Sequence, residues 1–263
     1  MKVSYFPGCT LKNKAKDLDL YAYKSAEVLG VTLEEIENWQ CCGGVFTTAR
    51  NEVATKLSSV RALKEAATKE QPLVTVCSAC HNVIKQTNYA MQNNEEFAGK
   101  VNRYMNEDNG YFGEANVYHY LEMLRDLVGF DTLKEKVVNS LKGKKIAAYY
   151  GCLLLRPNSV MKMDDPENPT IMEDFIKALG ADAVVYAMRN ECCGGYVSVE
   201  SPALARKNSN AVVENAKSQG AEMIITACPL CKYNLEKNGA DIPVVYFTEL
   251  LAEALGVKED TNE

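Results

Sequence analysis

The sequence predicts an α/β fold made of two pseudo-symmetric repeats, with mostly parallel sheets flanked by helices. Short apolar runs rich in β-branched residues alternate with stretches of helical periodicity, and this alternation favours parallel strands covered by helices. The same cysteine pattern occurs twice along the chain, which indicates an internal repeat. We expect residues 1–143 to hold the first repeat and a helical connector, and residues 144–263 to hold the second repeat, packed as one globular unit.

Four apolar runs predict buried strands at equivalent places in the two repeats. Residues 3–9 (VSYFPGC) match residues 146–152 (IAAYYGC), and each run ends at a cysteine. Residues 73–77 (LVTVC) match residues 224–228 (IITAC) in the same way. Their length and composition are typical of strands that are buried within a sheet.

Helical stretches lie between these runs. Apolar residues at helical spacing predict a helix over residues 47–69 and its counterpart over residues 202–218. The connector between the repeats predicts two more helices, over residues 117–128 and 131–141. The second repeat has extra residues, which we place in a polar, proline-bearing surface loop at residues 156–169. Contacts that are specific to the second repeat should involve this loop.

Ten cysteines carry the repeat, and none is left over. In both copies 34 residues separate an adjacent pair from a closing C-x-x-C, whereas the first gap is 31 residues in one copy and 39 in the other. The first set is Cys9, Cys41, Cys42, Cys77 and Cys80. The second set is Cys152, Cys192, Cys193, Cys228 and Cys231. This register predicts two equivalent metal sites with these ten residues as ligands.

Composition favours metal ligands over disulfides. The chain has 263 residues, is 47% hydrophobic and carries a formal charge of -6. It shows no signal peptide and no apolar run of the roughly 20 residues that span a bilayer, so we expect a cytoplasmic protein without a membrane span. In a reducing compartment, patterned cysteines are more often metal ligands than disulfides. The acidic balance argues against nucleic acid as a partner.

The residues beside the cysteines suit iron and sulfur. Cys77 and Cys228 follow predicted strands, and a helix beginning there would point its free N–H groups at a thiolate. Glycine permits close approach of the backbone to a bulky ligand. The cofactor-binding candidates are therefore Gly43, Gly44, Gly194 and Gly195. Five thiols per repeat exceed the four ligands of structural zinc or of an ordinary cubane, which indicates a polynuclear site without fixing its formula.

Other candidate groups are few. The sequence has no ferredoxin-type cysteine run, no G-x-G-x-x-G and no P-loop, so we expect no flavin and no nucleotide. His81 follows Cys80 and is a candidate proton donor, although a solvent-facing position on a helix is the favoured interpretation. His119, three residues before Glu122, is interpreted as a packed or hydrogen-bonded residue. The tyrosines near the first cysteine of each repeat are interpreted as core residues.

The motifs resemble those of the CCG-domain family and, within it, those of the heterodisulfide reductase B subunit. The matching segments are FPGCT, NWQCCGG, CSACHN, NECCGG, CPLCKYNLE and VVYFTELLAEALG, which extend over nearly the whole chain. The resemblance implies two noncubane 4Fe-4S clusters, each held by the five cysteines of one repeat. It also implies a small-molecule disulfide of the CoM-S-S-CoB type as substrate, reduced by one electron from each cluster.

The resemblance further implies partner proteins and leaves other interpretations open. A ferredoxin-like iron–sulfur C subunit and a flavin-containing A subunit would deliver electrons, in the setting of methanogenesis and flavin-based electron bifurcation. Alternatively, the chain is an electron-relay subunit of a bacterial complex, for example one with a methylenetetrahydrofolate reductase, that does not turn over coenzyme M or B. A lactate-utilisation branch of the family and structural zinc in one repeat are the remaining alternatives.

Overall fold

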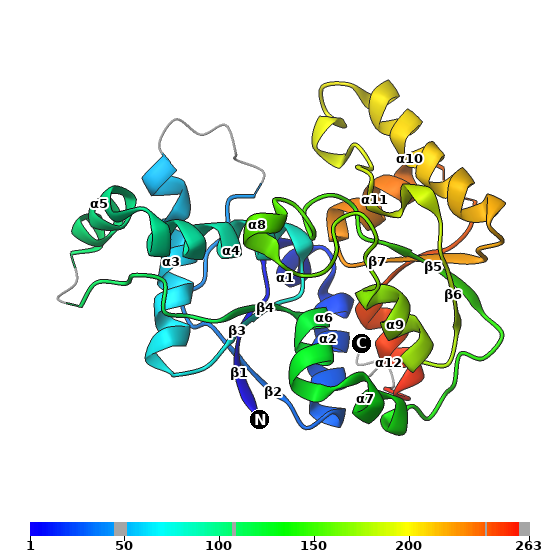
Figure 1. The fold of residues 1–263 in the computed structure, drawn as a ribbon, viewed down its shortest axis with the longest axis horizontal. Helices are drawn as coiled ribbons and strands as arrows, with labels where there is room; N and C mark the ends of the chain where they lie inside the picture. Colours follow the sequence, from blue (N-terminus) through cyan, green and yellow to red (C-terminus); the bar gives the residue numbers. More distant parts are fainter. Residues whose placement is uncertain (45–51, 107–108, 240, 258–263) are drawn as a thin grey trace.

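The computed structural model describes residues 1–44, 52–106, 109–239 and 241–257. Two four-stranded sheets, one in each repeat, are flanked by helices (Figure 1). Their strand orders are β2-β1-β3-β4 and β6-β5-β7-β8, and neighbouring strands in both sheets pair in parallel. The shared order confirms the predicted α/β fold with two pseudo-symmetric repeats.

The four runs predicted as strands form the two central strands of each sheet. The first sheet consists of β1 (Lys2–Phe6), β2 (Thr32–Glu35), β3 (Leu73–Thr75) and β4 (Val117–His119). The second consists of β5 (Lys145–Tyr149), β6 (Asp182–Val184), β7 (Met223–Thr226) and β8 (Val244–Tyr246). The outer strands have three or four residues each, too few for a periodicity to indicate them.

Helices cover both sheets and largely match the expected positions. The first repeat and connector contain α1 (Cys9–Asn13), α2 (Lys16–Val28), α3 (Glu52–Thr68), α4 (Ser78–Asn93), α5 (Glu95–Met105), α6 (Tyr120–Met123) and α7 (Phe130–Lys136). The second repeat contains α8 (Asn158–Met161), α9 (Ile171–Ala178), α10 (Pro202–Ser218), α11 (Pro229–Lys237) and α12 (Phe247–Ala254). The helix predicted over residues 202–218 is confirmed as α10. The helix predicted over residues 47–69 is confirmed as α3, and its first residues lie outside the described part of the chain.

The connector differs from the prediction. The helix expected over residues 117–128 is wrong at its start, because Val117–His119 pairs with β3 as the parallel edge strand β4. The helix begins at Tyr120, where the side chains of His119 and Glu122 form a capping box. It then continues as one π-helical turn, η1 (Leu124–Val128). The helix expected over residues 131–141 is α7, which ends at Lys136.

Among the described residues, the larger of two hydrophobic clusters extends through both repeats, and the smaller one lies within the second repeat. The larger cluster includes Val3 of β1, Ile146 of β5 and Leu250 of α12. In Figure 1, α12 near the C-terminus packs against α2 near the N-terminus. The second sheet begins at Lys145, next to the expected boundary between residues 143 and 144, and the division into two domains stays a prediction.

A hydrogen-bond network joins the two sheets directly after their central strands. The hydroxyl group of Tyr246 donates to the carbonyl oxygens of Val76 and, at 3.0 Å, of Ala227. The carbonyl oxygen of Ala227 also accepts hydrogen bonds from the backbone N–H and the hydroxyl group of Ser78, at 3.0 and 2.7 Å. All four residues are buried. The segments that follow β3 and β7 are therefore held together.

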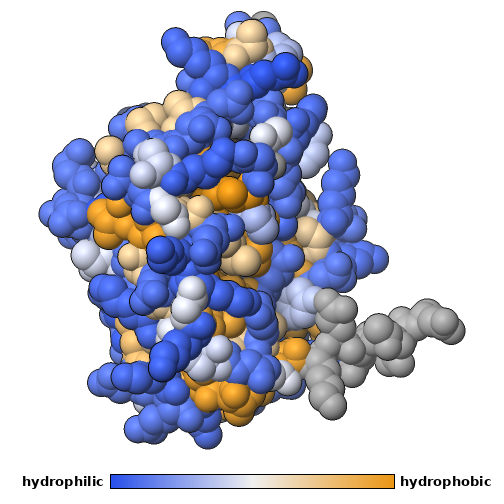
Figure 2. Space-filling view, turned by 90° about the vertical axis from the view of Figure 1, so that its right-hand side faces the viewer, coloured by the Kyte–Doolittle hydropathy of each residue, from blue (hydrophilic) through white to orange (hydrophobic). Residues whose placement is uncertain are grey.

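The surface shown in Figure 2 is mainly hydrophilic, with its hydrophobic residues in separate groups. Large hydrophobic side chains that are exposed include Val185, Val199 and Tyr233. Across the part of the chain that the structure describes, no helix combines the length and the apolar character needed to cross a membrane.

Candidate metal centre

The ten cysteines lie at the carboxyl edges of the two sheets. In a parallel sheet the carboxyl ends of the strands meet at one edge, and open α/β folds bind their ligands there. The segments after β1, β2 and β3 carry the first set, and the segments after β5, β6 and β7 carry the second. Cysteines that are far apart in the sequence therefore come together at each edge.

The two C-x-x-C segments begin the helices that follow the central strands. Cys77 is the N-cap residue of α4 and Cys228 is the N-cap residue of α11, as the sequence predicts. Cys80 and Cys231 lie in the first turns of these helices. The free N–H groups and the positive end of each helix dipole are thus close to the thiols, where they favour thiolate.

The remaining cysteines differ in how far they are exposed to solvent. Cys9 begins the short helix α1, whereas its counterpart Cys152 lies in a turn after β5. The adjacent pairs lie in irregular segments between β2 and α3 and between β6 and α10. In both pairs the first cysteine is exposed and the second is buried. One thiol of each pair therefore faces the interior while its neighbour is accessible to solvent.

The five cysteines of each repeat line one cavity. Those of the first repeat line a cavity of about 500 Å³ between the repeats. Those of the second repeat line a much smaller cavity of about 20 Å³. Tyr196 and Leu230 line both cavities, so the two sites adjoin. The structure thus gathers each predicted set of ligands as a separate group and places the two groups next to each other.

Contacts between thiols shift their pKa values. Cys42 Sγ lies 3.3 Å from Cys80 Sγ, and Cys193 Sγ lies 3.6 Å from Cys231 Sγ. The contact with Cys80 lowers the pKa of Cys42 to about 7 and raises the pKa of Cys80. The contact with Cys231 likewise lowers the pKa of Cys193 to about 7. Each buried pair therefore readily supplies a thiolate, which is the form that binds metal.

The four candidate glycines lie beside the buried cysteines of the adjacent pairs. A Cβ atom at Gly44 or at Gly195 would lie 3.5 Å from Sγ of the buried cysteine two residues earlier, so the backbone passes close to both thiols. Gly43 and Gly194 have φ angles of 75° and 81°, which other residues adopt only with strain. A Cβ atom at Gly194 would also lie only 2.8 Å from Ala205 Cα. Their role in holding a cofactor stays a prediction.

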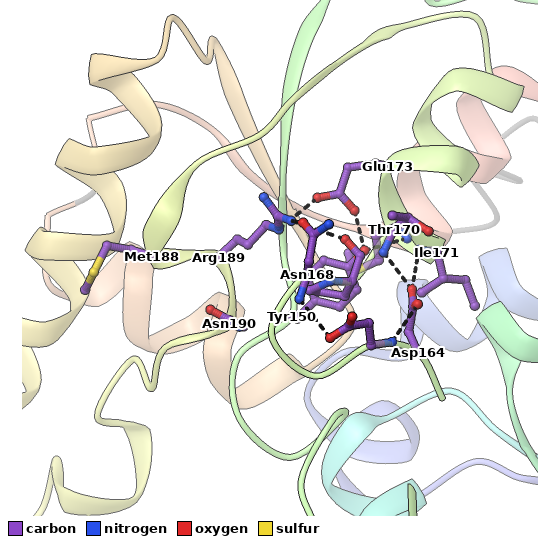
Figure 3. A network of polar contacts seen from close by, with 12 residues as sticks. Tyr150, Asp164, Asn168, Thr170, Ile171, Glu173, Met188, Arg189 and Asn190 are labelled. Atoms are coloured by element: carbon purple, nitrogen blue, oxygen red, sulfur yellow. Dashed lines mark hydrogen bonds and ion pairs between the residues drawn. The ribbon is translucent and has the colours of Figure 1, made fainter. Parts of the chain in front are cut away.

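A buried polar network supports the second site (Figure 3). Tyr150, which lines the second cavity, donates a hydrogen bond to Glu173, and the Glu173 carboxylate lies 3.3 Å from Nε of Arg189. The guanidinium group of Arg189 also donates to the side chain of Asn168. The carbonyl oxygen of Arg189 accepts a hydrogen bond from the backbone N–H of Tyr150 at 2.8 Å. Burial raises the pKa of Glu173, and the buried guanidinium group provides the compensating charge.

The loop at residues 156–169 contacts both repeats and is not wholly exposed, and its role in contacts specific to the second repeat stays a prediction. It contains α8, and the side chains of Met161 and Met163 are buried. Asn82 of α4 donates a hydrogen bond to the carbonyl oxygen of Arg156 at 2.8 Å. The loop therefore also connects the second repeat to the helix that begins at the first C-x-x-C.

His81 is fully buried, so the favoured interpretation of a solvent-facing residue is wrong. Its Nε2 atom lies 3.2 Å from Glu122, and Lys85 Nζ lies 3.0 Å from the other oxygen of the same carboxylate. Burial lowers the pKa of His81, which favours the neutral ring and leaves Lys85 as the charged partner of Glu122. His119 is buried and accepts a hydrogen bond through Nδ1, which confirms the interpretation of a packed, hydrogen-bonded residue.

The donor set fits a group that is bound through sulfur. All ten cysteines are free thiols, which are soft ligands typical of iron–sulfur and zinc sites. Among the described residues, no three His, Cys, Asp or Glu side chains are arranged around the position of one metal ion. Five thiols on each cavity exceed the four ligands of a structural zinc site, so the donor set suits an iron–sulfur cluster.

Fold and site together define a duplicated α/β protein with a cysteine-rich metal-binding edge in each half. The family model described as cysteine-rich domain (CCG) matches residues 3–85 and again residues 146–236. The chain therefore belongs to this family, and each match contains one complete set of five cysteines. The membership confirms the two repeats expected from the sequence and supports iron–sulfur clusters as the cofactors.

Curated relatives resemble the chain along most of its length. The 8-methylmenaquinol:fumarate reductase membrane anchor subunit of Wolinella succinogenes is 30% identical, over 97% of this chain and 92% of that protein. The B subunit of the ferredoxin/F(420)H(2)-dependent CoB-CoM heterodisulfide reductase of Methanosarcina acetivorans is 28% identical, over 98% of this chain and 91% of that protein. The second match confirms the resemblance to the B subunit of heterodisulfide reductase.

A solved structure has the same fold. It is a hypothetical protein from Helicobacter pylori, and the two structures align with a TM-score of 0.73 over 98% of this chain. The sequences are 12% identical, and the chain spans about half the length of that protein, or 49%. This likeness supports the fold alone.

Sequence reasoning missed several residues that shape the site. Tyr196 directly follows the second cysteine–glycine motif, and Leu230 lies inside the second C-x-x-C. Their closeness to the cysteines in the sequence was therefore the signal that could have indicated both residues. Tyr246 and Ser78 join the two repeats through Ala227. That contact depends on how the repeats pack, and no local pattern in the sequence indicates it.

Proposed function

We propose that the chain is the iron–sulfur catalytic subunit of a heterodisulfide reductase-type complex. It would hold two noncubane 4Fe-4S clusters, one on each set of five cysteines, and reduce a disulfide of the CoM-S-S-CoB type. The observation that carries this proposal is the pair of adjoining cavities, each lined by five thiols and both bordered by Tyr196 and Leu230. Similarity to the B subunit of a heterodisulfide reductase supports it.

Two adjoining redox sites suit the electron count of this reaction. Cleavage of one disulfide to two thiols consumes two electrons and two protons. Each bound cluster would supply one of the electrons. The chain's own residues fix the relative position of the two sites, because Tyr246 and Ser78 hold the segments after β3 and β7 together. The cavity of about 500 Å³ has the size of a small-molecule site and gives a substrate access to the first set of thiols.

The proposal extends to the surroundings of the two sites. His81 stays the candidate proton donor, and the glycines after the adjacent pairs stay the candidate cofactor-binding residues. The electron-delivering partners would be a ferredoxin-like C subunit and a flavin-containing A subunit, in a cytoplasmic complex capable of electron bifurcation. Where coenzymes M and B are present, this complex would belong to methanogenesis.

An electron-relay subunit is the second candidate function. The observation that favours it is the 30% identity to a subunit of a fumarate reductase, whose name mentions a quinol and no disulfide. In that case the same two sites would pass electrons between partners, and no disulfide would be cleaved.

Stopped-flow mixing of the reduced, cluster-loaded protein with candidate disulfides separates the two functions. The catalytic proposal expects rapid oxidation of the protein, with one disulfide consumed for every two electrons. A variant with Cys228→Ser and Cys231→Ser is the control, because the remaining site cannot complete a two-electron reduction. If no disulfide oxidises the protein while a protein acceptor does, the chain is a relay. EPR of the oxidised protein should also show a new signal when coenzyme M or B thiol is added.

A further inference from the structure

The two cysteine cavities are unequal, and they meet at two side chains. The first cavity has about 500 Å³ and the second about 20 Å³. Tyr196 and Leu230 line both of them. A molecule in the larger cavity therefore contacts the thiols of the first set, whereas these two side chains stand between it and the buried thiols of the second set.

The two side chains differ in how firmly they are held. A Cβ atom at Gly195 would lie 3.0 Å from Leu230 Cγ, so Leu230 packs tightly against the backbone of its own repeat. Tyr196 is 40% exposed, and its hydroxyl group donates one hydrogen bond, at 2.9 Å, to the carbonyl oxygen of Gly44. One hydrogen bond between neutral groups contributes little net stability in water. Tyr196 is therefore the residue of the two that can swing aside.

The hydrogen bond of Tyr196 crosses from one site to the other. Tyr196 lies in the short 3-10 helix η3 (Gly195–Val197), three residues after Cys193, while Gly44 lies two residues after Cys42. Burial and the thiols of Cys228 and Cys42 raise the pKa of Tyr196, which agrees with thiols of both sets lying near its hydroxyl group. The side chain therefore links the two sites as well as separating them.

The sequence has this tyrosine in the second repeat only. The residue that follows Gly44 in the first repeat is Val45, which lies outside the described residues. A valine side chain has no hydrogen-bond donor, so it cannot form an equivalent link. The two repeats therefore differ in sequence at the position after the cysteine–glycine motif.

We propose that Tyr196 is a positioning residue that closes the second cysteine site toward the larger cavity and opens it when the ring swings aside. Molecules entering the larger cavity meet the first set of thiols before the second. The catalytic consequence, that a disulfide contacts both sites only after Tyr196 moves, rests on the proposed function. The closure of the second site by Tyr196 does not depend on the proposed function.

The test measures how fast each cysteine of the full-length, metal-free, reduced chain is alkylated, using peptide mass spectrometry. Iodoacetamide serves as the small reagent and a bulky aryl maleimide as the large one. In Tyr196→Ala, we expect the maleimide to modify Cys193 and Cys228 about tenfold faster. The rate with iodoacetamide should rise less, because a small reagent needs less opening to reach these thiols. Tyr196→Phe keeps the ring and loses the hydrogen bond, so we expect an increase of only about threefold.

Two controls separate closure from general loosening. Cys192 is exposed in the native chain, so its rate should stay unchanged in every variant. Tyr233→Ala alters a side chain that lines the larger cavity but not the smaller one, and it should leave Cys193 and Cys228 unchanged. Circular dichroism verifies that each variant is folded.

Three results would overturn the proposal: unchanged maleimide rates in Tyr196→Ala, equal gains with both reagents, or the same gains in Tyr233→Ala. If Tyr196→Ala fails to fold, the comparison of Tyr196→Phe with the native chain decides, and unchanged rates there reject the role of the hydrogen bond. No disulfide is used in this experiment, so a failure of the proposed catalytic function leaves its outcome intact.

Discussion

Replacing Tyr246 with phenylalanine removes the hydroxyl group that joins the two repeats next to both cysteine sites. This hydroxyl group donates to Val76 and Ala227, and the side chain is fully buried. Ala227 keeps its two hydrogen bonds from Ser78, whereas Val76 loses this donor. A lost hydrogen bond costs about 1 kcal/mol, and a buried carbonyl left without its donor raises the cost toward about 3 kcal/mol. We expect the free energy of unfolding to fall by about 1–3 kcal/mol.

Equilibrium urea unfolding of the metal-free chain, followed by circular dichroism, measures this change. Tyr149→Phe is the matched control, because the buried Tyr149 donates to a single carbonyl oxygen, that of Glu191 at 2.8 Å, within one repeat. It should cost about 1 kcal/mol. A double-mutant cycle of Tyr246→Phe with Ser78→Ala should give a coupling energy of at least about 0.5 kcal/mol, because both residues donate to Ala227.

The reasoning about the joint between the repeats fails under either of two results. One is a loss below about 0.5 kcal/mol in Tyr246→Phe, since a buried carbonyl would then have lost its donor at no cost. The other is additivity within about 0.3 kcal/mol in the double-mutant cycle, since residues that share an acceptor should couple.

Three further substitutions test other parts of the structure. Burial would raise the pKa of Glu122, but His81, Lys85 and the backbone N–H of His119 lower it to about 2. A carboxylate with a lowered pKa stabilises the fold above its unfolded pKa of about 4.5 and loses that contribution as the pH falls toward 2. In acid titrations, the difference in the free energy of unfolding between the native chain and Glu122→Gln should therefore shrink across this pH range. A constant difference would contradict this assignment. Arg189→Met leaves Glu173 buried without its partner and should lower the free energy of unfolding in urea by about 3–5 kcal/mol. Adding Glu173→Gln should restore part of this loss, and no recovery would argue against the buried ion pair. Gly194→Ala and Gly220→Ala both place a side chain at positive φ, but only the new side chain at position 194 meets an atom within 3 Å. In thermal unfolding, Gly194→Ala should therefore lose about 1–3 kcal/mol more stability than Gly220→Ala. Equal losses would count against the close contact with Ala205.

The sequence identified the parts of the fold that carry a strong local pattern. The central strands of each sheet are apolar runs that end at a cysteine, and α10 has a clear helical periodicity, so all of these were predictable. The edge strand β4 was not, because its three residues run directly into α6 and look like the first turn of that helix. Pairing with β3 determines their conformation, and that pairing is not visible in the sequence.

The same element explains the error at His81. Its environment depends on Glu122 of α6, which β4 positions against α4. With residues 117–128 interpreted as one helix, nothing in the sequence placed a carboxylate beside the imidazole ring. The cysteines were easier, because the repeat cross-checks every position, and because Cys77 and Cys228 lie where a predicted strand is followed by a helix. The sequence did not indicate Tyr196, because its role depends on the unequal cavities on its two sides.

Metal and sulfide analysis of half-site variants tests the central claim most directly, namely that each repeat binds its own cluster. The native chain, reconstituted under anaerobic conditions, should bind about eight irons with matching sulfide, as two four-iron clusters require. Replacement of Cys77 and Cys80 with serine should leave about four irons, and replacement of Cys228 and Cys231 should do the same. Stoichiometric zinc in the native chain, or the loss of all iron in both variants while the fold is retained, would contradict two independent cluster sites.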